Sequence, residues 1–367
     1  MLNNLRTKKN TSPKKVFVGL SGGVDSAVSA ALLVRAGYDV TGVFIRIVLP
    51  GYPCPAVTDR QDAMRVAAHL KIPFRDIDLS KQYEERVFKH TLEEYARGRT
   101  PNPDVLCNRE IKFGLFFEYA MREGATYVAT GHYARTKQED GHTLLYTGND
   151  TAKDQSYFLW MVPETQLAKT LFPVGALQKS QVRALALKFG LPNATRKDSQ
   201  GLCFLGAIAM DTMLTRELHP LPGDVVSEDG HVIGCHNGAL LYTLGQRHGF
   251  IVQHRSPDDQ RPLYVIAKDT THNTITVSAQ AFPPHASKTS ISLTSCNWIG
   301  PVSTGTGAAR YRYRQALIKT HVRSIGDTTT LELLEPQYVP AGQSLVVYLK
   351  DRCLGGGVVD KSIPLFD

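Results

Sequence analysis

Short apolar runs alternate with amphipathic stretches from residue 15 to about residue 135. Such alternation is typical of parallel β-strands joined by crossover helices. The run 16–20 predicts a buried strand, residues 24–36 a helix, and residues 39–47 the next strand. We expect three further helices and one further strand, over residues 58–70, 80–97, 107–123 and 126–130. The pattern therefore predicts an α/β fold for the first half of the chain.

The pattern changes in the second half. Residues 141–148 predict a hairpin, and residues 163–190 predict an all-helical appendage interrupted at Pro173 and Gly175. Beyond residue 218, apolar positions alternate with a period of two between turns rich in Gly, Pro, Asn and Asp, which indicates the short strands of β-barrels. These strands are expected over residues 225–232, 263–267, 274–278, 328–334 and 344–349.

Two proline-rich segments, 220–223 and 282–285, indicate domain boundaries. We expect a disordered basic tail, then an α/β domain on a parallel sheet with a helical appendage, then two small all-β domains, the last a β-barrel. These four parts are expected over residues 1–15, 16–217 with the appendage from about 151, 218–283 and 284–367.

Composition and charge narrow the class of protein only a little. No apolar run approaches the ~20 residues of a membrane span, and no apolar stretch follows the basic N-terminus as in a secretory signal. We therefore expect a cytoplasmic protein. The net charge is +8, but the first 15 residues hold five cations and no acid, which leaves +3 for the rest. A solvated tail explains these cations, with an arm that contacts phosphate as the alternative.

The six cysteines are widely spread and form no CxxC pair, so neither a structural metal nor an iron–sulfur cluster is expected. Cys107 opens a predicted helix that also carries Arg109 and Lys112, and both the helix dipole and these cations acidify a thiol. Asp104, one turn earlier, is a candidate general acid or base. Cys203 lies in a polar loop that contains glycine. The alternative for each cysteine is an inert, buried thiol.

A Ser-Gly-Gly turn separates the first predicted strand from the first predicted helix, where unpaired backbone N–H groups bind phosphate. Gly22 and Gly23 let the backbone approach an anion closely. Ser21 and Ser26 offer hydroxyl donors, and Asp25 can orient the loop or help to hold a metal. No Walker lysine follows, so release of pyrophosphate fits better than cleavage at the γ-phosphate. A glycine turn without a ligand is the alternative.

Residues 310–314 read Arg-Tyr-Arg-Tyr-Arg. In a strand, the period of two puts three guanidinium groups on one face and two phenol rings on the other. Guanidinium groups suit phosphate oxygens and tyrosines stack on unpaired bases, so this strand favours RNA binding. A solvated edge strand whose tyrosines lie in the barrel core is the alternative.

The segment SGGVDS at residues 21–26 resembles the SGGxDS hallmark of the PP-loop ATP pyrophosphatases, which adenylate a carbonyl or amide oxygen and let a nucleophile displace AMP. Over nearly its whole length, the chain resembles the tRNA-specific 2-thiouridylases of that superfamily. The segments that carry the resemblance are GLSGGVDSAVSA, CPAVTDRQDAMRVAAHLKIPF, EEYARGRTPNPDVLCNREIKFG, ATGHYAR, KDQSYFLW, DSQGLCFLG, YTLGQRHG, RYRYRQ and PAGQSLVVY.

The resemblance implies a PP-loop catalytic domain whose appendage binds tRNA, and a role for each matching residue. ATP would be held by Gly19, Leu20, Ser21, Gly22, Gly23, Val24, Asp25, Ser26, Ile45 and Gly131. The target base would meet Asn102, Pro103 and Asp104. Cys203 would carry a persulfide, and Cys107 would attack it or become its disulfide partner. Contacts with tRNA are implied for His132, Lys153, Asp154, Gln155, Arg312, Tyr313 and Gln343.

The resulting hypothesis is a tRNA uridine 2-sulfurtransferase that adenylates the C2 oxygen of the wobble uridine and replaces it with sulfur. We expect Mg²⁺ with the ATP, because expulsion of pyrophosphate concentrates charge. The expected partners are tRNA and a persulfide donor, either a cysteine desulfurase or a relay protein, and the enzyme is expected to be a monomer. Two alternatives stay open, an amide-forming PP-loop ligase and a non-catalytic RNA-binding module with a vestigial ATP loop.

Overall fold

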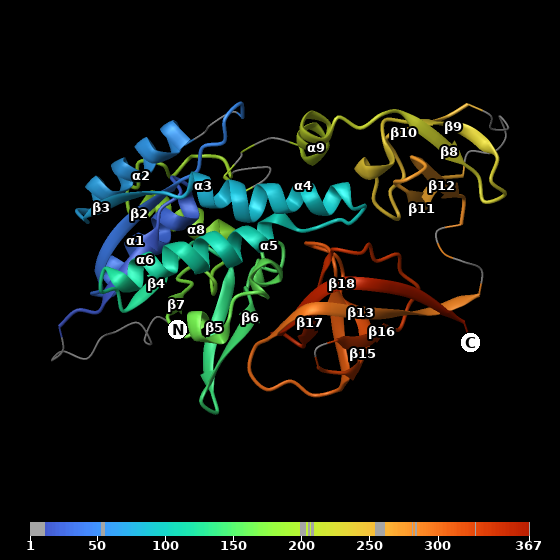
Figure 1. Ribbon diagram of the computed structural model, residues 1–367. Coiled ribbons are helices and arrows are strands. Elements are labelled where there is room, and N and C mark those ends of the chain that lie inside the picture. Colours follow the sequence, from blue (N-terminus) through green and yellow to red (C-terminus); the bar gives the residue numbers. More distant parts are fainter. Residues whose placement is uncertain are drawn as a thin grey trace.

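The computed structural model describes residues 12–52, 56–198, 203–204, 206, 209–253, 261–280, 282, 285–326 and 328–366. Its strands form three sheets (Figure 1). The parallel sheet and its helices lie at one end of the molecule, and a small sheet and a barrel lie at the other. The predicted order, an α/β half followed by two small all-β parts, is confirmed.

Five parallel strands form the first sheet, in the order β3-β2-β1-β4-β7. They are β1 (Lys15–Gly19), β2 (Asp39–Arg46), β3 (Phe74–Asp78), β4 (Tyr127–Ala129) and β7 (Thr170–Leu171). The strand order reverses between β1 and β4, which is where such sheets bind ligands. The predicted tail is too long at its end, because Lys15 begins β1 and its ammonium donates to the Glu123 carbonyl at 2.7 Å. Residues 1–11 lie outside the described part.

Helices cover both faces of this sheet. On one face, α1 (Val24–Arg35), α2 (Ala56–Leu70) and α8 (Lys179–Lys188) pack against Val16 and Val18. On the other face, Phe17 shares one apolar cluster with the segments 80–96 and 103–122, and α9 (Met210–Leu218) packs on the first of these segments. This follows from the alternation of side chains along a strand.

The two long helical segments on the second face each contain a π-helical stretch. The first comprises α3 (Ser80–Tyr83), η2 (Glu84–Phe88) and α4 (Lys89–Ala96), and the second α5 (Pro103–Cys107), η3 (Asn108–Leu115) and α6 (Phe116–Arg122). Asn102 caps the second segment by accepting a hydrogen bond from the Val105 N–H at 3.2 Å. The prediction that this helix begins at Cys107 is therefore wrong. Cys107 lies past the first turn, where the dipole has less effect.

The region after β4 mixes strands and short helices. The predicted hairpin is formed by β5 (Ala134–Glu139) and β6 (His142–Thr147), and η4 (Ser156–Leu159), α7 (Glu164–Leu167) and β7 follow. The prediction of an all-helical appendage is wrong at β7, because this strand pairs with β4 through Val128↔Thr170 and Ala129↔Leu171. A strand of two residues is too short for its periodicity to reveal it.

The second sheet has the strand order β10-β9-β8-β12-β11. Its elements are β8 (Gly223–Val226), β9 (Val232–His236), the 3₁₀-helix η5 (Ala239–Leu241), β10 (Phe250–Val252), β11 (Tyr264–Asp269) and β12 (Thr274–Ser278). The single strand predicted over 225–232 is in fact parts of two strands, because the Ser227 N–H donates to the His231 carbonyl and Gly230 turns the chain at φ +81°.

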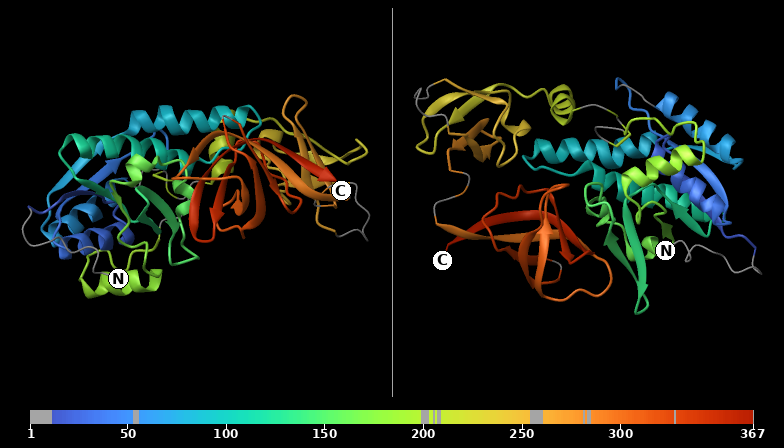
Figure 2. Two further views of the ribbon diagram at one scale, coloured as in Figure 1. Left: turned by 90° about the horizontal axis from the view of Figure 1, so that it is seen from below. Right: turned by 180° about the vertical axis from the view of Figure 1, so that it is seen from behind.

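The third sheet closes into a barrel, because β13 pairs with both β16 and β18. Its strands are β13 (Ala286–Trp298), β14 (Gly305–Arg310), β15 (Ile318–Ser324), β16 (Thr329–Leu333), β17 (Ser344–Leu349) and β18 (Arg352–Phe366). The hairpin of the α/β half joins this sheet, since β18 also pairs with β6 through Arg352↔Tyr146 and Cys353↔Leu145. The barrel thus adjoins the α/β half, as Figure 2 shows from two further sides.

The strand predicted over residues 310–314 ends at Arg310. The chain then turns, with Arg314 at φ +62° and the Gln315 side chain accepting from the N–H groups of Tyr311 and Arg312. Arg310 and Tyr311 are both buried, whereas Arg312 and Arg314 are exposed. The prediction of three guanidinium groups on one strand face is therefore wrong.

Candidate active site

The turn between β1 and α1 has the form of a phosphate-binding loop. Ser26 Oγ accepts from the Ser21 N–H at 3.3 Å and donates to the Gly23 carbonyl at 3.0 Å. The side chains of Leu20 and Val24 are buried, so only their backbone groups can meet a ligand. Gly23 caps α1 without a side-chain hydrogen bond. The first N–H groups of α1 are therefore available to an anion.

Two glycines make this loop possible. Gly22 has φ +76°, and a Cβ there would lie 2.5 Å from a backbone oxygen of α2. A Cβ on Gly131, just after β4, would lie 2.7 Å from the Ser26 nitrogen. The segment after β4 can therefore rest directly on the phosphate loop. Gly19 ends β1, and the Ile45 side chain is buried within β2.

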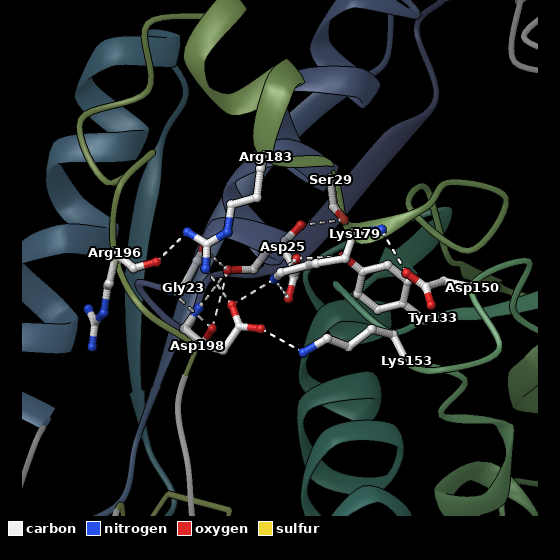
Figure 3. A network of polar contacts seen from close by, with 12 residues as sticks. Gly23, Asp25, Ser29, Tyr133, Asp150, Lys153, Lys179, Arg183, Arg196 and Asp198 are labelled. Atoms are coloured by element: carbon white, nitrogen blue, oxygen red, sulfur yellow. Dashed lines mark hydrogen bonds and ion pairs between the residues drawn. The ribbon is translucent and has the colours of Figure 1, made fainter. Parts of the chain in front are cut away.

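Charged side chains gather at the phosphate loop (Figure 3). Lys179 of α8 binds the Asp25 carboxylate at 2.7 and 2.8 Å and the Asp198 carboxylate at 2.8 Å. Asp198 also pairs with Lys153 at 2.7 Å and with Arg183 at 2.6 Å. Burial alone would raise the pKa of Asp198, but these cations hold it well below its usual range. Three cations and two carboxylates thus converge where the phosphates of a nucleotide would lie.

Four residues of this cluster were not predicted from the sequence, namely Lys179, Arg183, Arg196 and Asp198. Arg196 donates to the Gly22 carbonyl at 3.4 Å and pairs with Asp59 and Asp62 of α2. The one local signal was the pair Lys179 and Arg183, which lie one turn apart at the start of a helix. Nothing local shows that α8 packs beside α1, so the cluster is a product of the tertiary fold.

Cys107 and Cys203 meet, although 96 positions separate them in the sequence. Their sulfurs lie 3.3 Å apart with Cys107 as the donor, and both are free thiols. Asp104 accepts a hydrogen bond from the Cys203 N–H at 3.2 Å, and the Tyr83 hydroxyl donates to the Cys203 carbonyl at 3.0 Å. The sulfurs are close enough that a small shift would allow a disulfide, whose bond is ~2.0 Å long.

Lys112 is the cation of this thiol pair. Burial alone would lower its pKa, but the sulfurs of Cys203 and Cys107 raise it, and it hydrogen-bonds to Cys203. The hydrogen bond from Cys107, together with the nearby Lys112 charge, lowers the pKa of Cys203 to about 7. Burial raises the pKa of Cys107 well above its ordinary value. These directions are opposite to the predicted acidification of Cys107, because the pKa of Cys203 is lowered and that of Cys107 is raised.

The π-helix η3 explains why Lys112 lies beside Cys107. In an α-helix the neighbours of a residue along one face are three and four positions away. The wider i→i+5 turn of a π-helix brings the fifth residue back towards the same side. Lys112 is five positions after Cys107. The sequence showed both residues on one helix, but α-helical periodicity did not predict their contact.

The remaining residues around the thiols are partly or fully buried. Burial raises the pKa of Asp104, although Lys112 opposes the shift, so its carboxyl is suited to exchange a proton nearer neutral pH. Asn102, beside the partly exposed Pro103, donates to the Tyr157 hydroxyl at 3.5 Å. Burial and the Lys112 charge lower the pKa of His132 well below its ordinary value, so its imidazole is neutral.

Lys153, Asp154 and Gln155 lie in the loop that follows the hairpin. Lys153 reaches Asp198 at the phosphate loop, and the Gln155 side chain accepts from the Tyr133 N–H at 3.0 Å. The Asp154 carboxylate instead points inward and forms a buried ion pair with Arg310. The prediction that Asp154 contacts tRNA is at odds with this placement, because its carboxylate is already bound within the protein.

The three residues predicted to contact tRNA from the barrel lie near the junction of the domains. Arg312 is exposed and donates to the Leu244 carbonyl of the small sheet domain at 3.3 Å. The Tyr313 ring packs on Phe158, with ring centroids 4.7 Å apart. Gln343 lies two residues after Ala341, whose carbonyl accepts from the N–H of Thr100 at 2.8 Å. Gln343 is therefore close in the fold to the segment that carries Asn102 and Asp104.

Residues 131 and 132 join the phosphate loop to the thiol pair. Gly131 rests on Ser26, while the ring of His132 lies 5.8 Å from the ring of Phe113 and within reach of the Lys112 charge. Lys112 also hydrogen-bonds to Cys203, so these two residues lie between the phosphate loop and the lysine of the thiol pair. This arrangement can bring an activated phosphate ester and a sulfur nucleophile to one substrate atom.

Within the described ranges, no three His, Cys, Asp or Glu side chains form a group that could hold a metal ion. No helix in the same residues is long and apolar enough to cross a membrane.

A parallel sheet with an SGGVDS loop at the point where its strand order reverses, beside a basic cluster and two thiols, defines an ATP-binding α/β enzyme of the PP-loop type. Family models match most of the chain in three parts. Residues 14–207 match the "tRNA methyl transferase HUP domain", residues 211–279 the "tRNA methyl transferase PRC-barrel domain" and residues 288–359 the "Aminomethyltransferase beta-barrel domain".

Two relatives match this chain over nearly its whole length. The tRNA-specific 2-thiouridylase MnmA of Bacillus subtilis is 41% identical over 96% of both chains, and that of Enterococcus faecalis is 42% identical over 96% of this chain and 97% of its own. The chain belongs to this family, that of the tRNA-specific 2-thiouridylases. A solved 4-thiouridine synthetase–RNA complex with bound ATP is 21% identical over 53% of this chain and 46% of its own, with a TM-score of 0.35, which is too small a likeness to bear on the fold or the ligand.

Proposed function

We propose that this protein replaces the C2 oxygen of a tRNA wobble uridine with sulfur, and that it uses ATP to activate that oxygen. The observation that carries the proposal is the pair of free thiols, 3.3 Å apart beside Lys112, in a chain of the 2-thiouridylase family. An amide-forming ligase or a non-catalytic RNA-binding protein has no use for such a pair.

In the activation step, the C2 oxygen attacks the α-phosphate of ATP and pyrophosphate leaves. The backbone N–H groups of residues 19–26 bind phosphate oxygens, with Ile45 and Gly131 beside the nucleotide. Lys179 and Arg183 offset the charge of the departing pyrophosphate. Asn102, Pro103 and Asp104 receive the base at the start of α5.

Mg²⁺ fits the same cluster. Asp25 and Asp198 both bind the Lys179 ammonium, so two carboxylates already converge on one positive charge. Carboxylate oxygens and ATP phosphates are the ligands that Mg²⁺ prefers. When bound, the ion would neutralise part of the charge that develops on the pyrophosphate.

In the sulfur step, Cys203 carries a persulfide received from a cysteine desulfurase or a relay protein. The terminal sulfur attacks C2, and the adenylated oxygen leaves as AMP. The Cys107 sulfur then attacks Cys203 Sγ, breaks the bond between the two sulfurs of the persulfide and leaves the sulfur on C2. Two thiols are thereby oxidised to a disulfide while the sulfane sulfur is reduced, so a thiol reductant must regenerate the pair.

Three neighbours serve this chemistry. Lys112 stabilises the Cys203 thiolate that accepts sulfur from the donor. The Asp104 carboxylate takes the Cys107 proton as the disulfide forms. His132, Lys153 and Gln155 contact tRNA beside the base, and Arg312, Tyr313 and Gln343 do so from the barrel. The enzyme acts as a monomer.

Mass analysis of tRNA nucleosides tests the proposal. The full chain is incubated with tRNA, ATP, Mg²⁺ and a persulfide donor, and 2-thiouridine is the expected product, whereas uridine that stays unmodified would contradict the proposal. Cys107→Ser and Cys203→Ser should abolish 2-thiouridine and keep tRNA-dependent pyrophosphate release. Cys353→Ser, at a buried thiol of the barrel, is the matched control. Full thiolation by both active-site variants would overturn the sulfur route.

A further inference from the structure

A buried ion pair crosses the junction between the barrel and the α/β half. Arg310 of β14 pairs with Asp154, and these residues are 8% and 4% exposed. Arg310 also donates to the Tyr348 hydroxyl of β17 at 2.9 Å. A buried ion pair adds little net stability, because desolvation offsets the attraction, although breaking one leaves an unpaired charge. We therefore ask whether the pair fixes the geometry of the residues around it.

Asp154 holds the loop in which it lies. Its carboxylate accepts hydrogen bonds from the N–H groups of Gly148 and Ser156, at 3.0 and 3.1 Å, and from the Ser156 hydroxyl at 3.0 Å. The Ser156 hydroxyl also lies 3.2 Å from the Tyr348 hydroxyl of the barrel. Residues on both sides of Asp154 are thus hydrogen-bonded to its carboxylate, which Arg310 of the barrel holds in place.

From this loop the contacts continue to the nucleotide site. Gln155 and Tyr133 exchange two hydrogen bonds, from the Gln155 N–H to the Tyr133 carbonyl at 2.9 Å and from the Tyr133 N–H to the Gln155 side chain at 3.0 Å. The Tyr133 hydroxyl donates to Asp25 of the phosphate loop at 2.8 Å. Burial and the Asp25 charge raise the pKa of Tyr133, so it stays a donor.

The surroundings of the pair are apolar. One hydrophobic core, shared by the barrel and the α/β half, includes Trp160, Val346 and Tyr348. It also includes Val105 and Phe113, which belong to the helical segment that carries Cys107 and Lys112. In such surroundings charged groups interact more strongly than in water, so displacement of Arg310 would be felt at Asp154.

We propose that Arg310 is a positioning residue for the nucleotide site. Through Asp154 it fixes the loop 148–156, and through Gln155 and Tyr133 that loop fixes Asp25. The seating of the barrel on the α/β half thus sets the geometry in which ATP binds. The inference rests on the proposed function only for its activity readout, because its main measurement is ATP binding without RNA.

The test compares Arg310→Met with the double variant Arg310→Met/Asp154→Asn, both in the full chain. The single change leaves a buried carboxylate unpaired, whereas the double change removes both charges, keeps an acceptor for the N–H groups of Gly148 and Ser156, and restores much of the thermal stability. Calorimetric titration with ATP and Mg²⁺ should give a Kd about tenfold higher for both variants. In turnover assays KM for ATP should rise more than kcat falls.

A purely structural role predicts the opposite for the double variant, in which ATP affinity would recover along with stability, and that result would overturn the inference. If Arg310→Met does not fold, Arg310→Lys supports the same comparison. This variant keeps the charge and loses the planar guanidinium group that reaches both Asp154 and Tyr348. Arg323→Met is the matched control, because Arg323 is a surface residue of the barrel paired with Glu332. Wild-type protein that binds ATP but forms no 2-thiouridine would overturn the proposed function and leave this inference intact.

Discussion

The charge of Lys112 should set the reactivity of Cys203. The pKa of Cys203 is lowered to about 7 from an ordinary 9.0, first by the hydrogen bond from Cys107 and then by the Lys112 charge, against the effect of burial. The substitution Lys112→Met keeps most of the side-chain volume and removes the cation. The pKa of Cys203 should then rise towards its ordinary value.

The size of the effect can be bounded. At pH 7, a thiol of pKa about 7 is about half ionised, and one of pKa about 9 is about 1% ionised, which is a loss of about fiftyfold in thiolate. A more basic thiolate is a better nucleophile by about six- to tenfold over the same range, since the Brønsted coefficient is about 0.4–0.5. The alkylation rate at pH 7 should therefore fall by up to about eightfold, and the midpoint of the rate–pH curve should move upward.

The assay is alkylation by iodoacetamide between about pH 5 and pH 10, with modified Cys203 identified by peptide mass spectrometry. Lys112→Arg, which keeps the charge, should leave the midpoint near its original place. Arg109→Met removes an equal charge from an exposed position of the same helical segment and should change nothing. An unaltered rate–pH curve in Lys112→Met would refute the assignment of Lys112 as the cation that stabilises the thiolate.

Two further predictions concern Gly131 and Lys268. Gly131→Ala should weaken ATP binding at least tenfold in calorimetry, because the new Cβ would lie 2.7 Å from the Ser26 nitrogen and force the phosphate loop to move. The control is Gly326→Ala, where no atom lies within 4 Å of the new Cβ, and this variant should bind ATP normally. Equal ATP binding by both variants would contradict the argument. Burial lowers the pKa of Lys268 to about 8 from 10.5, so the unfolded chain binds more protons between those values and stability should rise with pH there. Thermal unfolding of Lys268→Met should lack that rise, and an identical pH dependence in this variant would count against it.

Much of the fold and part of the site follow from local sequence. The phosphate loop was predictable because its glycines and serines lie in one short turn between a strand and a helix, and each has a local conformational reason. The strands over 274–278 and 344–349 were predicted with their observed bounds, since alternation over five or six residues is a local property. Cys107 and Asp104 were identified as candidates from a stiff turn followed by a helix.

Other features depended on which segments the fold brings together. The alternation over residues 310–314 predicted a strand that in fact ends at Arg310, and only the packing of the barrel decided that this guanidinium turns inward to Asp154. The acidity of Cys203 comes from Cys107 and Lys112, on a helical segment that is distant in the sequence. The sequence by itself thus determined many of the helices and strands and identified the reactive groups, because both depend on a few neighbouring residues. Tertiary structure alone decided which thiol ionises and which arginine is buried, because charge and burial depend on contacts between distant segments.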